Sequence, residues 1–382
     1  MSKLLIAHGG APTAVLNASL AGAIREAQSH ADIDGVLGAR HGTAGILKED
    51  FADLGSLTQP ELKALSLSPG SAIGTSRTPL EAGDYARMRD VLRRHGIRYV
   101  LLAGGNGTMD TCLRLWNLCR QDDIFVGGIP KTIDNDLALT DHAPGYGSAA
   151  RFAAVSMREI AADVAALPIH VCIVEYMGRN AGWIAAASAL ARRKAEDAPH
   201  LILLPEVPFD EDDFLERVQC IWALGKGVVV AVSEGIRRAD GTPVAPPVFT
   251  SGRATYFGAV SQYLSRLVIE KLGIKARCET PGILGRCCAE LVSDTDRREA
   301  EAMGALAART VLKGQGGQMA GLKRISEDPY RCSEILIPLE NMKLTERSIP
   351  DAWLMPYDVS PALLDWCRPL IGGALPETVM EL

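Results

Sequence analysis

Apolar and polar stretches alternate along this chain in the pattern of an α/β fold. Three short apolar runs, residues 4–7, 97–103 and 124–129, each lead into a turn rich in Gly or Pro, as buried strands do. The first two are followed by segments with helical apolar spacing, residues 14–28 and 109–120. Strand, turn and helix in this order predict a parallel sheet covered by helices on both faces.

The same alternation continues through the second half of the chain. Strands are predicted at residues 171–176, 201–204, 228–232 and 274–278. Helices are predicted at residues 149–167, 181–194, 210–224, 258–272 and 294–312. Residues 318–322 and 335–339 are short apolar runs, and we predict no clear elements in the rest of the tail. With 382 residues, the chain has room for two Rossmann-like lobes, each with a parallel sheet covered by helices.

Composition narrows the class of partner. A hydrophobic fraction of 47% with 23% charged residues is typical of a soluble globular protein. The formal net charge of −6 argues against nucleic acid but leaves phosphorylated small molecules open, because they need only a few local cations. Nine scattered cysteines, without a Cys-x-x-Cys or zinc spacing, indicate reduced thiols and a cytoplasmic protein. We expect neither a signal peptide nor a membrane-spanning segment.

Two Gly-rich turns are candidates for binding phosphate. Gly9-Gly10 follows the first strand, and Gly104-Gly-Asn-Gly-Thr108 follows the strand at residues 97–103. The backbone N–H groups of such a turn and the N-terminus of the next helix both favour an anion. Either turn alone is equally consistent with a plain tight turn, but two at one edge of a sheet favour a phosphate site. Neither is a Walker loop, because no Gly-Lys-Ser/Thr follows.

The segment Lys131–Asp136, Lys-Thr-Ile-Asp-Asn-Asp, carries the strongest candidate chemistry. It follows Pro130, which cannot donate a hydrogen bond to a sheet, so we place it in a loop at the carboxyl end of a strand. In an extended loop, Asp134 and Asp136 point the same way and can share a proton, a metal or a hydroxyl, with Lys131 keeping both ionised. The alternative is a turn with solvated charges.

A third glycine motif has another explanation. The residues Gly145-Tyr-Gly-Ser-Ala-Ala150 match the dinucleotide-binding pattern. That pattern requires a preceding strand, whereas Asp141-His-Ala-Pro144 precedes this one. We therefore predict a helix N-terminus here, capped near Gly147 or Ser148.

The motifs at residues 104–108, 130–136 and 177–179 (Met-Gly-Arg) make the chain resemble the phosphofructokinase family. The resemblance runs from Gly9 to about Arg286, in the family's order. Four further stretches are most similar to the pyrophosphate-dependent branch of this family: Pro12–Asn17, Lys131, Arg179–Trp183 and Ala198–Pro205. The resemblance implies transfer of a phosphoryl group from pyrophosphate to the 1-hydroxyl of fructose 6-phosphate, with Mg²⁺ as cofactor. The product is fructose 1,6-bisphosphate, and the reaction is reversible.

The resemblance also implies roles for individual residues. Asp134 corresponds to the base that takes the proton of the sugar hydroxyl, and the implied catalytic set is Lys131, Thr132, Asp134 and Asp136. The implied donor-binding set is Gly9, Gly10, Arg77, Gly104, Gly105, Asn106, Gly107 and Thr108. The implied sugar-phosphate set is Met177, Gly178, Arg179, Glu234, Arg277 and Arg286. Mg²⁺ is expected at Asn106 and Asp136.

Departures from the family pattern leave alternatives open. Asn106 replaces a metal-associated Asp, and Gly107 is typical of ATP-dependent members whereas Lys131 is typical of pyrophosphate-dependent ones. ATP is therefore the alternative donor. Ile283 and Gly285 loosen the expected 6-phosphate pocket, so sedoheptulose 7-phosphate is an alternative acceptor. A non-catalytic regulatory subunit and a NAD or diacylglycerol kinase are further alternatives.

The family's lobes exchange segments, which shapes the expected domains. We predict a donor-binding lobe of residues 1–145 plus about 285–335. The sugar-phosphate-binding lobe is predicted to contain residues of about 146–284 plus 336–382. The resemblance implies a homodimer or homotetramer with shared sites.

Overall fold

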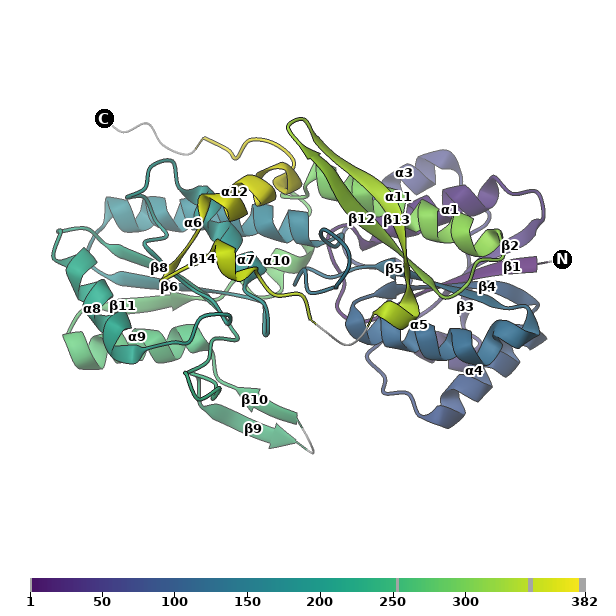
Figure 1. Ribbon diagram of the computed structural model, residues 1–382, viewed down its shortest axis with the longest axis horizontal. Helices are drawn as coiled ribbons and strands as arrows, with labels where there is room; N and C mark the ends of the chain where they lie inside the picture. Colours follow the sequence, from purple (N-terminus) through teal and green to yellow (C-terminus); the bar gives the residue numbers. More distant parts are fainter. Residues whose placement is uncertain (1, 252–253, 343–345, 378–382) are drawn as a thin grey trace. The chain divides into compact units, whose positions relative to one another are not determined.

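The computed structural model describes residues 2–251, 254–342 and 346–377 (Figure 1). The chain forms two compact units. Unit 1 contains Met1–Ser148 and Arg286–Arg347, and unit 2 contains Ala149–Gly285 and Ser348–Leu382. Residues 336–342, 346 and 347 therefore belong to unit 1, whereas the prediction placed them in the second lobe. In the described part of the chain, no helix is long and apolar enough to cross a membrane.

Unit 1 is built on a seven-stranded sheet with strand order β13-β12-β5-β4-β1-β2-β3. Its strands are β1 (Ser2–His8), β2 (Ile33–Ala39), β3 (Phe51–Asp53), β4 (Ile97–Gly104), β5 (Phe125–Pro130), β12 (Gln318–Glu327) and β13 (Tyr330–Pro338). The inner pairs are parallel, but β3 and β13 are antiparallel to their neighbours. The expected all-parallel sheet is thus wrong at both edges. At the β13 edge the connection is too short for a parallel crossover, because only residues 328–329 separate β12 from β13.

Helices cover both faces of this sheet (Figure 1). One face carries α1 (Leu16–Gln28), α3 (Gln59–Leu67) and α11 (Asp294–Leu312), which pack against Leu4 and Ile6 of β1. The other carries α2 (Thr43–Lys48), α4 (Ala82–Arg94) and α5 (Asn106–Cys119), which pack against Leu5 and Ala7. Successive side chains of β1 therefore enter opposite cores, as strand geometry requires.

Unit 2 has a four-stranded parallel sheet with strand order β11-β6-β8-β7. Its strands are β6 (Val171–Tyr176), β7 (Leu201–Leu203), β8 (Val228–Ser233) and β11 (Ala276–Glu279). Two hairpins lie outside this sheet. One is formed by β9 (Pro247–Ser251) and β10 (Ala254–Phe257), and the other by β14 (Leu354–Met355) and β15 (Asp358–Val359). The helices are α6 (Tyr146–Ala166), α7 (Trp183–Ala187), α8 (Glu211–Trp222), α9 (Val260–Leu272), α10 (Leu284–Cys287) and α12 (Pro361–Cys367). Short 3-10 helices occur in both units. Those at Arg120–Asp122 and Leu339–Asn341 belong to unit 1, and those at Ser188–Ala191, Asp351–Trp353 and Arg368–Ile371 belong to unit 2.

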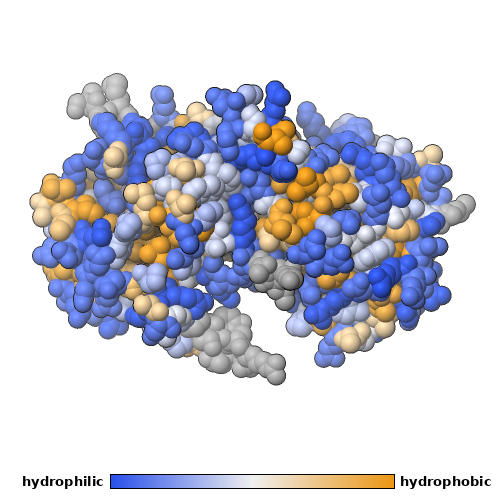
Figure 2. Space-filling view, in the orientation of Figure 1, coloured by the Kyte–Doolittle hydropathy of each residue, from blue (hydrophilic) through white to orange (hydrophobic). Residues whose placement is uncertain are grey.

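Several predicted elements differ from the structure. The long helix predicted at residues 181–194 is only α7 followed by a 3-10 turn. Helix α6 begins at Tyr146, so Gly147 and Ser148 lie inside its first turn and not at its cap. Apart from Leu339, the apolar runs at residues 318–322 and 335–339 lie in the hairpin β12–β13, whereas helix α12 lies in the rest of the tail, where we predicted no clear elements. Polar residues cover much of the visible face (Figure 2), as the composition led us to expect.

Two glycines allow α1 and α11 to pack closely. A Cβ atom on Gly22 would lie 2.1 Å from the carbonyl oxygen of Glu301, and one on Gly304 would lie 1.9 Å from the carbonyl oxygen of Ser19. Both distances are far inside van der Waals contact with backbone. Residues 294–312 are joined to the N-terminal part of unit 1 by this crossing.

We expect Gly304→Ala to lower the free energy of unfolding by about 2–3 kcal/mol, because overpacking must push the two helices apart. Urea unfolding followed by circular dichroism measures the change. Gly83→Ala in α4 is the matched control, since nothing lies within 4 Å of its Cβ position. It should be neutral or stabilising by up to about 1 kcal/mol. Equal stability of both variants would contradict the close crossing.

Candidate active site

A cavity of about 660 Å³ lies in unit 1, where β1, β4 and β5 end. Most of the predicted donor-binding and catalytic residues line it: Gly9, Gly10, Arg77, Gly105, Asn106, Gly107, Thr108, Lys131, Thr132, Asp134 and Asp136. Glu346, which we did not predict, lines it too. Adjacent parallel strands bring these three loops together, because their carboxyl ends share one edge of the sheet.

The two Gly-rich turns pack against each other through Thr108. A Cβ atom on Gly9 would lie 2.4 Å from Thr108 Oγ1, and one on Gly104 would lie 2.1 Å from the same atom. Gly10 has a φ of +73°, which favours glycine, and its N–H donates to the carbonyl of Ser76. Gly104 therefore serves packing, and it does not appear among the residues that line the cavity.

The N-terminus of α5 opens on this cavity. The helix begins at Asn106, so Asn106–Thr108 form its first turn and do not precede it as predicted. Its N-cap is Gly105, which has no side chain to occupy the end of the helix. Nothing lies within 4 Å of the Cβ position of Gly107. A helix N-terminus of this kind favours a bound anion.

Lys131 places an ammonium group in the wall of the cavity. The residue is only 4% exposed, and its Nζ donates a 2.5 Å hydrogen bond to the carbonyl of Ala11 in the first turn. Burial lowers the pKa of Lys131 to about 8, although Asp134 acts in the opposite direction. The charges of Arg77 and Arg286 lower this pKa further. Lys131 is therefore mostly protonated at neutral pH, in a place where an anion would lower its free energy.

The two carboxylates do not lie on an extended loop. Asn135 between them is buried and has a left-handed φ of +53°, and its Oδ1 accepts the N–H of Ala143. The expected extended geometry is thus wrong, yet Asp134 and Asp136 both line the cavity. Burial raises the pKa of Asp136, while the charges of Asp134 and Asp136 raise the pKa of Lys131, so the expected interaction between the lysine and the two carboxylates is present.

Asn106 and Asp136 present oxygens suited to a hard cation. Asn106 Nδ2 donates to Asp136 Oδ2 over 3.0 Å, which leaves Asn106 Oδ1 as the acceptor of that amide. Asp136 Oδ1 is buried and has no hydrogen-bond partner among the described residues. Mg²⁺ is typically held by one or two carboxylates together with substrate phosphates and water. These two residues fit that pattern.

We did not predict roles for Asn135 or Asp296, whose side chains accept hydrogen bonds from the backbone of residues 143 and 145, close to this site. Asp296 is buried in the first turn of α11 and accepts hydrogen bonds from the N–H groups of Gly145 and Ser148 and from Ser148 Oγ. In sequence, Asp296 is one of several acidic residues at a helix start, and Asn135 is a typical turn residue. Only their burial and partners distinguish them.

Four of the predicted sugar-phosphate residues gather in unit 2. Met177, Gly178 and Arg179 follow β6, and Glu234 follows the adjacent strand β8. The N–H of Gly178 lies 3.4 Å from Glu234 Oε1. A Cβ atom on Gly235 would lie 1.6 Å from the carbonyl oxygen of Arg179, so only glycine fits there. The two loops are therefore in direct contact.

The two arginines predicted as a pair, Arg277 and Arg286, fall in different units. Arg277 lies in β11 opposite Cys172, four positions before the end of β6 at Tyr176, which is roughly 13 Å along a strand. Burial lowers the pKa of His170, and the charge of Arg277 lowers it further. Arg286 belongs to unit 1 and acts on Lys131. Arg277 thus does not lie with the turn at residues 177–179.

Comparison with known proteins identifies the family of this chain. The family model described as Phosphofructokinase matches residues 3–311, and the chain belongs to that family. The pyrophosphate–fructose 6-phosphate 1-phosphotransferase of Xanthomonas campestris is 39% identical over 98% of this chain and 92% of its own length. The enzyme of the same name from Rhodospirillum rubrum is 36% identical over 98% and 95%. The crystal structure of a pyrophosphate-dependent phosphofructokinase from Marinobacter aquaeolei superposes with a TM-score of 0.88 at 33% identity, covering 99% of this chain and 94% of that one.

We expect Lys131→Met to raise the free energy of unfolding at pH 7. The same substitution should abolish phosphoryl transfer, because it removes the ammonium from the cavity. The drop in the pKa of Lys131 from 10.5 to about 8 corresponds to about 3 kcal/mol at pH 7. The lost hydrogen bond to Ala11 offsets about 1 kcal/mol of this, so a net gain of about 2 kcal/mol is expected.

The sign of this effect can be tested by pH. Between pH 8 and 10.5 the unfolded chain binds more protons at Lys131 than the folded one, so wild-type stability rises with pH in that window. The advantage of Lys131→Met should therefore shrink above pH 8. Urea unfolding at pH 7 and pH 10 measures it, with exposed Lys63→Met as the control. An advantage that is the same at both pH values would contradict a destabilised ammonium.

Proposed function

We propose that this protein transfers a phosphoryl group reversibly from pyrophosphate to the 1-hydroxyl of fructose 6-phosphate. The observation that carries the proposal is the buried ammonium of Lys131 beside Asp134 and Asp136, in a cavity that also contains Arg77 and a helix N-terminus. Phosphoryl transfer needs positioned cations and one base more than it needs covalent chemistry. The names of the relatives support the same reaction.

Pyrophosphate is favoured as the donor by the placement of Lys131. Its Nζ lies 3.4 Å from the Cβ position of Gly10 and donates a hydrogen bond to the carbonyl of Ala11. Lys131 therefore places one positive charge next to the first Gly-rich turn. The open space at Gly107 is the observation that favours ATP, because a nucleoside would need such room. We rank pyrophosphate first because a compact, highly charged donor benefits most from a desolvated ammonium.

The reaction follows from the residues that line the cavity. Asp134 accepts the proton of the sugar 1-hydroxyl while that oxygen forms a bond to a phosphorus atom of pyrophosphate. The bond from that phosphorus to the bridging oxygen breaks, and orthophosphate leaves with its electron pair. Lys131, Arg77 and the N-terminus of α5 neutralise the charge on the transferred group and the leaving group.

Mg²⁺ would be held by Asn106 and Asp136, where it would neutralise phosphate charge. Asn106 is a neutral ligand, so this ion would depend on Asp136 and on the oxygens of the donor. Burial raises the pKa of the Asp136 carboxyl, and a bound cation would oppose that effect.

The sugar-phosphate role is proposed for the loops of unit 2. Glu234, in contact with the turn at residues 177–179, can accept hydrogen bonds from sugar hydroxyls, and Arg179 can pair with a phosphate. Arg277 beside His170 lies well before the end of β6, which supports a homodimer or homotetramer in which Arg277 serves the site of another copy. Nine free cysteines support a cytoplasmic location.

A donor assay tests the proposed reaction. Purified protein is offered fructose 6-phosphate with either pyrophosphate or ATP, and fructose 1,6-bisphosphate is measured by coupling to aldolase. We expect turnover with pyrophosphate, and the reverse reaction with fructose 1,6-bisphosphate and orthophosphate. Turnover with ATP but none with pyrophosphate would establish the alternative donor and refute the proposal.

We expect Asp134→Asn to lower kcat by about 10³-fold, because the amide cannot accept the hydroxyl proton. The KM values for both substrates should change little, since the amide keeps the size of the carboxyl. Asp90→Asn in α4, an exposed carboxylate paired with Arg89, is the control and should leave kcat unchanged. An Asp134→Asn enzyme with wild-type kcat would assign the base elsewhere.

A further inference from the structure

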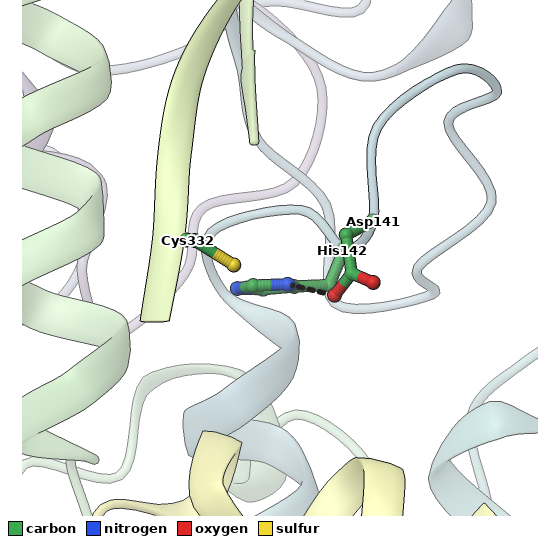
Figure 3. Close-up of side chains that lie close together, drawn as sticks. All are labelled: Asp141, His142 and Cys332. Atoms are coloured by element: carbon green, nitrogen blue, oxygen red, sulfur yellow. Dashed lines mark hydrogen bonds and ion pairs between the residues drawn. The ribbon is translucent and has the colours of Figure 1, made fainter. Parts of the chain in front are cut away.

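A buried ionic cluster is centred on His142 (Figure 3), shortly after the segment Lys131–Asp136, which we call the catalytic loop. The residue is 1% exposed, and its imidazole lies between two carboxylates. Its Nδ1 is 2.8 Å from Asp141 Oδ2, and its Nε2 is 2.6 Å from Glu299 Oε2 on α11. The proposed reaction makes no use of this group.

Charged and polar groups from three further segments surround His142 and its two carboxylate partners. Arg324 of β12 contacts Asp141 Oδ2 over 3.2 Å. Tyr330 of β13 donates to the second oxygen of Glu299 over 2.6 Å and lies 3.1 Å from Cys332 Sγ. The charge of Asp141 also acts on buried Arg347. The cluster thus joins the 141–142 segment to α11 and to the hairpin at the edge of the sheet.

The contacts define the protonation state of His142. Carboxylate oxygens accept hydrogen bonds, so both ring nitrogens must donate, and the ring is an imidazolium. Glu299 and Asp141 outweigh the effect of burial and raise the pKa of His142 to about 9. Potential ligand atoms of Asp141, His142 and Cys332 lie within 4.8 Å of one another, the arrangement of a metal site. With both nitrogens donating, the ring offers no lone pair to a metal, which favours the ionic cluster.

The segment after His142 is bonded directly to the catalytic loop. The N–H of Ala143 donates to Asn135 Oδ1 over 3.0 Å, and the carbonyl of Pro144 accepts the N–H of Thr132 over 3.2 Å. These two contacts lie on either side of Asp134. The N–H of Arg347 donates to the carbonyl of Asp136 over 2.9 Å, which adds a third tie.

We propose that His142 is a positioning residue: held between Asp141 and Glu299, it fixes residues 143–144 and through them the catalytic loop that carries Asp134. The proposal rests on the proposed role of Asp134. A loop held within a fraction of an ångström is what proton transfer requires, and small displacements of a reacting group reduce rates strongly.

The charge of His142 sets the pH range over which the loop is held. Its pKa of about 9 in the folded protein exceeds the ordinary value of 6.5, so the contribution to stability is complete below pH 6.5 and is lost as pH rises through 9. At saturating pyrophosphate, where the titration of Lys131 no longer limits binding, wild-type kcat should fall above about pH 9.

The test compares His142→Gln, Glu299→Gln and the double variant with wild type. Each single variant should lower kcat by about tenfold to a hundredfold with the KM for fructose 6-phosphate unchanged, because the loop is displaced but the sugar site is not. The double variant should lose no more than either single one, since both remove the same contact. The fall in kcat above pH 9 should be absent in His142→Gln.

Cys332→Ala is the matched control, because Cys332 lies in the same cluster but carries no charge in it. It should keep wild-type kcat. Hydrogen exchange of residues 132–136 supplies a readout without catalysis, and it should accelerate in His142→Gln and Glu299→Gln but not in Cys332→Ala.

Wild-type kcat and wild-type exchange in His142→Gln would overturn the proposal. So would one equivalent of bound zinc in the purified protein that is lost in Cys332→Ala, because His142 would then be a metal ligand. An inactive wild-type enzyme with either donor would instead refute the proposed function, while the exchange experiment would still decide the role of His142.

Discussion

The site depends on a positive charge that is kept out of water. The charged form of Lys131 would have a lower free energy in water. The residue nevertheless follows the end of β5 and lies in the wall of the cavity, where its ammonium donates a hydrogen bond to the carbonyl of Ala11. Burying an ammonium is costly unless an anion or a hydrogen bond compensates it. The protein therefore holds a charge whose cost of burial a bound anion would offset.

The glycines of the site make that placement possible. Gly9 and Gly104 both lie against Thr108, so the first turn and the start of α5 approach each other more closely than side chains would allow. The N-terminus of α5, Arg77 and Lys131 then act on one volume. Removing water from such a volume strengthens each electrostatic contact within it.

The segments next to the catalytic loop are held by helix α11, which lies about 160 residues further along the chain. Helix α11 contributes both Asp296, which holds the start of α6, and Glu299, which holds His142. The close crossing of α11 with α1, which Gly22 and Gly304 permit, connects this helix to the N-terminal strands. Residues separated by about 160 positions thus share one rigid support.

The sequence alone predicted most strands and helices outside residues 29–96 and the tail. It also predicted the two Gly-rich turns and placed Lys131, Asp134 and Asp136 at the end of a strand. These predictions depend on local patterns: apolar periodicity, turn residues and short motifs. Residues 29–96 and most of the tail were not assigned elements. Among their strands, β3, β14 and β15 have only two or three residues, and β3 and β13 lie at the edges of the sheet, where the apolar pattern is weak.

Tertiary structure alone decided what depends on contacts between distant segments. The left-handed turn at Asn135 requires its bond to Ala143, and the direction of the pKa shift of Asp136 requires its burial. The separation of Arg277 from the turn at residues 177–179 depends on strand register. His142 and Glu299 lie 157 positions apart, and only the packing of α11 against the sheet turns an ordinary histidine into a buried cation beside the site.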